Sequence, residues 1–92
     1  MRYIDVSWKH DSSTDPYRLV SEIDETNYES RKLEFFKDGE VGFASSQIKS
    51  RFTGLGDQEI PSLEEINSSS ELVGKNISKT EFDALWQKYV QT

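Results

Sequence analysis

The first part of the chain alternates apolar and polar residues, and this pattern predicts β-strands. In residues 2–10, apolar side chains occupy every second position from Ile4 to Trp8. A second alternating stretch covers residues 17–24, after a polar loop that ends in Pro16. Because the connecting loop is short, we expect these two strands to be antiparallel neighbours.

The sequence also predicts a β-hairpin that joins residues 31–37 to residues 40–44. The pair Asp38-Gly39 separates the two stretches, and glycine accepts the positive φ that a tight turn requires. Residues 45–59 carry serines and glycines around few apolar positions. We expect a loop there, with at most one short strand.

Two helix starts follow, each marked by the sequence of a capping box. In Ser62-Leu-Glu-Glu65 and Ser78-Lys-Thr-Glu81, the Ser and Glu side chains can pair with amides that the first turn leaves unpaired. The first predicted helix is short and ends near Asn67. In the second, one apolar stripe at helical spacing should pack on the sheet, and its members are Phe82, Leu85, Trp86 and Tyr89.

These elements predict an α+β fold that forms a single domain over residues 1–92. We expect an antiparallel sheet of four to five strands, in which the first four form a meander with the hairpin at Asp38-Gly39. A short helix and a C-terminal amphipathic helix should pack on this sheet. The fifth strand would lie between the helices, in residues 71–77, where Gly74 suggests a bend.

The alternation also suggests which residues share a face of the sheet. One set would face the C-terminal helix: Ile4, Val6, Trp8, Leu19, Ile23, Leu33, Phe35, Val41 and Phe43. The opposite face would then show Tyr3, Asp5, Val20, Glu22, Glu34, Phe36 and Ala44. Such an aromatic surface edged by acids is typical of a protein interface. The alternative is that the first helix or the loop at 45–59 covers Phe36 and Tyr3.

The charge of the chain changes which partners to expect. The 92 residues carry a net charge of −6, and residues 1–30 contribute −4 of it. An acidic surface repels phosphate backbones and anionic lipids, so we expect a basic protein partner, no nucleic acid and no membrane. The alternative is that this charge only keeps a small domain soluble. The chain has no cysteine and no apolar leader, which favours the cytoplasm.

The residues offer little for catalysis, so we expect a protein that is not an enzyme. The single histidine, His10, follows a strand without a nucleophile motif nearby. Carboxylates are plentiful, but their positions are typical of turns and helix starts. The glycines of Gly54-Leu-Gly56 lack the remainder of a phosphate-binding motif. We expect no cofactor and no metal site.

Several phrases of the sequence resemble a small bacterial family of unknown function. They are Met1-Arg-Tyr-Ile-Asp-Val-x-Trp8, Arg18-Leu-Val-Ser-Glu22, Arg31-Lys-Leu-Glu-Phe-Phe-x-Asp-Gly39, Pro61-Ser-Leu-Glu-Glu-Ile-Asn67, Ile77-Ser78, Glu81-Phe82 and Leu85-Trp86. They cover nearly the whole chain, but the resemblance implies no activity. In size and charge the chain is also similar to immunity proteins of contact-dependent and polymorphic toxin systems.

The second resemblance implies a cytoplasmic immunity protein that neutralises a basic toxin, for example a nuclease. Acids could then stand where the phosphates of the substrate would lie. The partner-binding candidates are acids of loops and of the second strand: Asp11, Asp15, Glu22, Asp24, Glu25, Asp57 and Glu59. The alternative function is a regulatory or scaffold domain that binds another protein. The sequence leaves the oligomeric state open.

Overall fold

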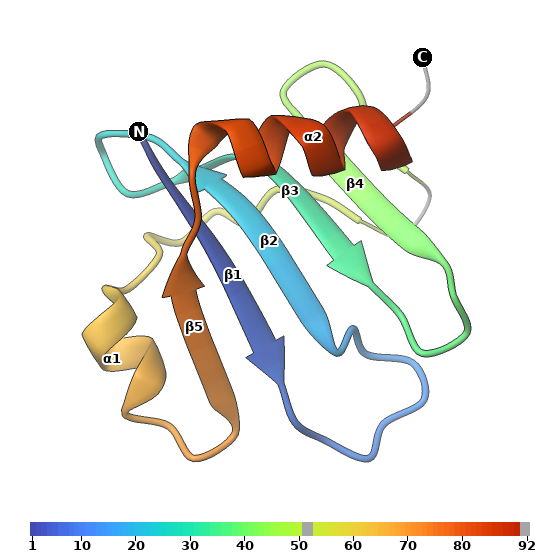
Figure 1. Cartoon of the computed structure of the whole chain (residues 1–92), viewed down its shortest axis with the longest axis vertical. Coiled ribbons are helices and arrows are strands. Elements are labelled where there is room, and N and C mark those ends of the chain that lie inside the picture. The colour runs from blue at the N-terminus through green and yellow to red at the C-terminus, as the bar shows by residue number, and fades with distance from the viewer. Residues whose placement is uncertain (51–52, 91–92) are drawn as a thin grey trace.

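The computed structural model describes residues 1–50 and 53–90, which form one sheet and two helices (Figure 1). The strands are β1 (Arg2–Trp8), β2 (Arg18–Ile23), β3 (Glu29–Phe35), β4 (Val41–Ser45) and β5 (Leu72–Asn76), and the helices are α1 (Leu63–Asn67) and α2 (Lys79–Tyr89). The predicted α+β fold is confirmed.

All neighbouring strands of the sheet are antiparallel, in the order β4-β3-β2-β1-β5. The first four form the predicted meander. The chain then crosses the sheet from the β4 edge to the opposite edge, where α1 precedes β5 (Figure 1). The hairpin between β3 and β4 turns at Gly39, whose φ is +93°, and the Asp38 carboxylate accepts the Glu40 amide at 2.9 Å. The first strand therefore lies inside the sheet and pairs on both sides.

Helix α2 covers one face of the sheet with the predicted apolar stripe. Phe82 is fully buried, and its ring centroid lies 5.5 Å from that of Tyr3. Trp86 and Tyr89 continue the stripe, with Trp86 packed edge-on to Phe43 and Tyr89 edge-on to Phe35. The helix starts with a complete capping box at Ser78, which fixes its entry onto the sheet.

The assignment of residues to the two faces was wrong for β1 and β2. The strand register places Leu33 opposite Val20, and Val20 opposite Asp5. The residues under α2 are therefore Tyr3, Val20, Leu33 and Phe35, whereas Ile4, Val6 and Ile23 pack against α1. Each face is covered in part, so the central strands β1 and β2 bury side chains on both sides. The expected aromatic surface edged by acids does not form, because Tyr3 lies under α2 and is 9% exposed.

Helix α1 packs on the other face by a close approach to β5. The strand pairs with β1 without interruption from Leu72 to Asn76, so the bend expected at Gly74 is absent. A Cβ at Gly74 would lie 2.8 Å from the Leu63 Cδ2 of α1. The missing side chain therefore lets the helix sit close to the strand.

Candidate functional site

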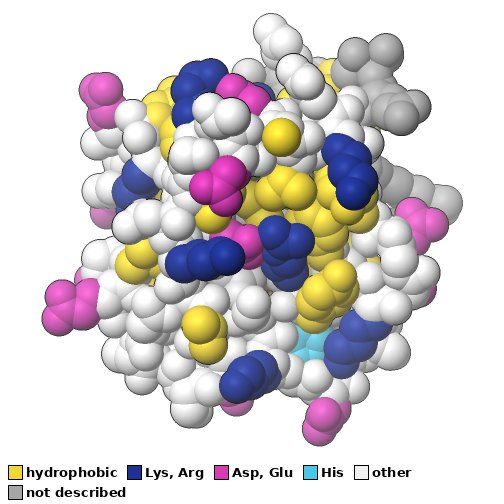
Figure 2. Space-filling view, in the orientation of Figure 1, with side chains coloured by type: hydrophobic (Ala, Val, Ile, Leu, Met, Phe, Trp, Pro, Cys, Tyr) yellow, Lys and Arg dark blue, Asp and Glu magenta, His cyan; other side chains and the backbone are white. Residues whose placement is uncertain are grey.

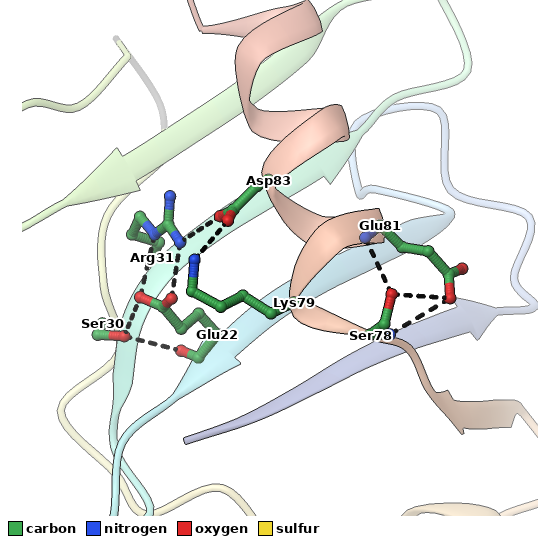
Figure 3. Close-up of polar contacts among 7 residues, drawn as sticks. All are labelled: Glu22, Ser30, Arg31, Ser78, Lys79, Glu81 and Asp83. Carbon is green, nitrogen blue, oxygen red and sulfur yellow. Dashed lines mark hydrogen bonds and ion pairs between the residues drawn. The ribbon is translucent and has the colours of Figure 1, made fainter.

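Four carboxylates are neutralised by ion pairs within the fold. The Arg31 guanidinium holds Glu22 through two bonds of 3.0 and 2.7 Å and also reaches Asp83 on α2 at 2.9 Å (Figure 3). Asp5 pairs in the same bidentate way with Arg18, and Glu29 pairs with Lys32. These acids stabilise the fold and do not present free charge to a partner.

The Arg31 network joins α2 to the sheet. Its guanidinium also stacks over the rings of Phe82 and Trp86, at 4.8 and 5.2 Å from their centroids. The hydrogen bonds from Arg31 hold the pKa of Glu22 below its ordinary value, and burial of the carboxylate opposes this only in part. On the helix, Lys79 and Arg31 lower the pKa of Asp83.

Unpaired acids are frequent in residues 53–74, the segment that contains α1. Residues 53–74 carry five acids and no base, and all five are exposed: Asp57, Glu59, Glu64, Glu65 and Glu71. We call them the α1 acidic surface. None of them makes an ion pair with a residue that the structure describes. Residues 53–74 thus carry a net charge of −5, in a chain whose total is −6.

An open groove of about 690 Å³ runs beside the start of α1, within the α1 acidic surface. Glu59 and Glu65 stand in its lining, together with the apolar Ile60, Pro61 and Leu63. The groove also receives Arg2, whose Nη2 donates to the carbonyls of Ile60 and Pro61 at 3.1 and 3.2 Å. Carboxylates beside apolar side chains can bind a basic side chain together with its hydrocarbon stem.

The capping box predicted at Ser62 and Glu65 forms only in part. The Ser62 hydroxyl accepts the Glu65 amide at 3.2 Å, as a capping box requires. The return bond from the Glu65 carboxylate to the Ser62 amide is absent from the hydrogen bonds of the described residues, whereas the box at Ser78 and Glu81 is complete. The Glu65 carboxylate is therefore left to the groove.

The seven predicted partner-binding acids do not form one site. Segment 56–60 is tied to the β2–β3 turn, because Gly56 donates to Glu29 and Ile60 donates to the Asn27 carbonyl. This brings Asp57 and Glu59 to the end of the sheet where Asp24 and Glu25 lie. Asp11 and Asp15 lie at the opposite end, in the loop between β1 and β2.

Two of the predicted acids have local structural tasks. Glu22 is only 6% exposed and is paired with Arg31, so it does not offer a free carboxylate. Asp24 accepts from the Thr26 hydroxyl, the Thr26 amide and the Tyr28 amide, and these bonds lower its pKa. The prediction did not include Glu64, Glu65 and Glu71. Their signal was present in the sequence, because residues 53–74 contain no base.

At each edge of the sheet, one outward-facing pairing position is occupied by groups from the same chain. At β5, the Asn67 side chain accepts from the Gly74 amide at 2.6 Å and donates to the Gly74 carbonyl at 3.0 Å. At β4, Ser50 accepts the Phe43 amide through its hydroxyl and donates its own amide to the Phe43 carbonyl. Exposed strand edges recruit other strands. These two positions are therefore not open to another strand.

The remaining chemistry of the described residues is limited. The His10 ring is engaged on both sides: Nε2 lies 2.7 Å from the Pro16 carbonyl, and Nδ1 accepts from the Ser12 amide at 3.1 Å. Within residues 1–50 and 53–90 there is no group of three or more His, Cys, Asp or Glu side chains placed to hold a metal ion. Neither helix in this part of the chain is long and apolar enough to cross a membrane.

Comparisons with known proteins identify a family without an activity. No curated protein and no solved structure matches the chain. One family model matches residues 2–91, which is nearly the whole length, in agreement with the sequence phrases that indicated a family of unknown function. The chain belongs to this family, described as Domain of unknown function (DUF6881).

Proposed function

We propose that this chain is a non-enzymatic binding protein whose α1 acidic surface docks on a basic partner protein, and that it acts in the cytoplasm as an immunity protein against a toxin. One observation carries the proposal. The chain neutralises part of its acid internally, while the α1 acidic surface keeps five exposed carboxylates without an ion pair among the described residues.

The groove at the start of α1 gives this surface an anchor point. In a basic nuclease, the cleft that binds nucleic acid is lined by lysine and arginine. Glu59 and Glu65 would meet such side chains where the substrate's phosphates otherwise lie. Opposite charge accelerates the encounter, and burial of about 1,200–2,000 Å² in total would suffice for a stable complex.

The experiment uses the protein encoded by the gene adjacent to this one as the test partner. The two are co-expressed and cell growth is scored, and the affinity of the purified pair is then measured by calorimetry. We expect rescue of growth and a dissociation constant of about 1 nM or below. Cell death without binding heat would contradict the immunity role for this pair and favour a regulatory or scaffold domain.

Charge-reversal variants locate the surface. The double variant Glu59→Lys with Glu65→Lys should weaken binding by about a hundredfold, because two carboxylates near the anchor become repulsive. The matched control, Glu34→Lys with Glu40→Lys, changes the net charge equally on the β3–β4 hairpin and should change affinity by less than about threefold. A third pair, Asp11→Lys with Asp15→Lys, tests the other end of the sheet. Equal losses in all three pairs would show that only net charge matters.

A further inference from the structure

Helix α2 leaves one part of its own sheet face uncovered. We call this part the open sheet face, and it consists of Asp5, Ser7, Arg18, Val73 and Lys75. The register places Ser7 opposite both Arg18 and Val73, and Asp5 opposite Lys75, so all five side chains leave the sheet on the same side. They line a hollow of about 390 Å³. This face lies below α2 in the view of Figure 2.

The charge of the open sheet face is opposite to that of the whole chain. Arg18 compensates Asp5 through Nε and Nη2, at 2.9 and 2.7 Å, and its guanidinium is also stacked over Phe35 at 4.7 Å. Lys75 is exposed and enters no ion pair with a described residue, so it adds uncompensated positive charge. In Figure 2, basic side chains cross this part of the molecule, while most acidic side chains lie near its outline.

An apolar side chain stands among these charges. Val73 is 54% exposed, although it lies in a strand that pairs with β1. Lys75 lies two positions along the same strand, and Ser7 separates Val73 from Arg18 across the sheet. An apolar side chain of a partner can therefore pack on Val73 while the two cations meet neighbouring carboxylates. The Nη1 donor of Arg18 makes no hydrogen bond to another described residue, and Arg18 is already held in place by Asp5 and Phe35. In this position it would bind a carboxylate without first losing much conformational freedom.

We infer that the open sheet face is a second binding surface, which takes an acidic segment of a partner protein. Carboxylates of the segment bind Lys75 and Arg18 Nη1, and a neighbouring apolar residue of the segment packs on Val73. The segment lies on the face of the sheet, because Asn67 occupies the pairing groups of Gly74 at the neighbouring edge. This surface lies on the side of the sheet opposite to the α1 acidic surface, so one chain can hold a basic and an acidic partner at once.

The test is a titration of the ¹⁵N-labelled protein with a short peptide in which single serines separate glutamate from valine, so that both share one side of an extended chain, followed by NMR. We expect saturable shifts of the amides of Ser7, Arg18, Val73 and Lys75. A matched peptide with lysine in place of glutamate should leave these amides unchanged. Lys75→Glu should weaken binding of the acidic peptide by about tenfold, whereas the control Lys49→Glu, in the loop after β4, should weaken it by less than about twofold.

Three results would overturn the inference. One is the absence of shifts at these four amides with the acidic peptide at millimolar concentration. Another is an equal loss of affinity in Lys49→Glu and Lys75→Glu, which would indicate attraction by charge alone. The third is equal binding of a thymidine oligonucleotide at the same amides, which would assign the face to phosphate. Both variants should fold, because each substituted side chain is exposed. Thermal unfolding checks this.

Discussion

The two faces of the sheet are covered in different ways. On one face, the eleven-residue α2 joins the sheet through a continuous aromatic cluster and through the Arg31 network. On the other face, the five-residue α1 contributes Leu63 and Ile66 to a smaller aliphatic cluster and carries only polar or charged side chains outward. The first face is built for stability. The second carries exposed acids on a thin layer, and the proposed docking of a basic partner uses these acids.

The largest expected effect comes from truncating one core residue on each face of the sheet. Phe82→Ala should lower the free energy of unfolding by about 3–5 kcal/mol, because it removes a fully buried ring from contact with Tyr3 and Trp86. Ile66→Ala should cost about 2 kcal/mol, at the lower end for such a change, because the α1 layer can relax around it. Urea unfolding followed by tryptophan fluorescence measures both.

The opposite order of these two losses of stability would contradict the proposed difference between the two faces. If Ile66→Ala destabilised the protein more than Phe82→Ala, α1 would be the main support of the sheet. A loss of cooperativity in the Ile66→Ala transition would instead indicate that α1 unfolds separately, which would sharpen the contrast. Circular dichroism recorded in the same titration distinguishes the two cases, because α2 contributes most of the helical signal.

The ion pair under α2 gives the next largest effect, and it depends on pH. The pKa of Glu22 is lowered in the folded protein, so its contribution to stability is fully present above the pKa of the unfolded chain, about 4.3. That contribution is lost as the pH falls through the lower, folded pKa. We expect Glu22→Gln to lower the free energy of unfolding by about 2 kcal/mol at pH 7 and by much less near pH 3.

The pH profile has an internal control. Glu40→Gln removes an exposed carboxylate that makes no ion pair among the residues described here, so its stability should follow that of the parent protein across the same pH range. Urea unfolding at several pH values between 3 and 7 measures the difference. A cost of Glu22→Gln that stays constant across this range would show that the residue acts by packing and not through its charge.

The elements of this fold could be predicted from the sequence because their signals are local. The stripe from Phe82 to Tyr89 and the turn at Gly39 depend on residues a few positions apart. The face to which each strand directs its apolar side chains could not be predicted in this way. Alternation shows that Ile4 and Val6 share a face, but both faces are buried, and only the register with β2 and β5 shows that they meet α1.

The candidate site was predicted in part, for a related reason. Glu22 looked like a free acid in a strand, because its neutralising partner, Arg31, lies in the next strand and meets it only through the register. Summed over residues 31–60, the net charge is zero, because bases up to Arg51 offset acids that include Asp57 and Glu59. This sum hides the negative charge of residues 53–74. Whether an acid is free or ion-paired depends on residues far away in the sequence. Local sequence patterns do not show these pairings.

The smallest expected effect on global stability belongs to Asn67, although its local effect is clear. Asn67→Ala removes the two bonds to Gly74 and should lower the free energy of unfolding by only about 1 kcal/mol, because water can replace both partners at an exposed edge. The Gly74 amide should nevertheless exchange its hydrogen much faster. We also expect concentration-dependent association through β5, because its edge is then open to another strand.

Hydrogen exchange and light scattering over a range of concentrations measure the two effects separately. Asn67→Asp is the matched variant, because it keeps an acceptor for the Gly74 amide and loses the donor to the Gly74 carbonyl. It should restore slow exchange at Gly74, and its added charge should oppose self-association. If Asn67→Ala stayed monomeric with unchanged exchange, the α1 layer would cover the edge without this side chain. The α1 layer would then be more rigid than the length of its five-residue helix suggests.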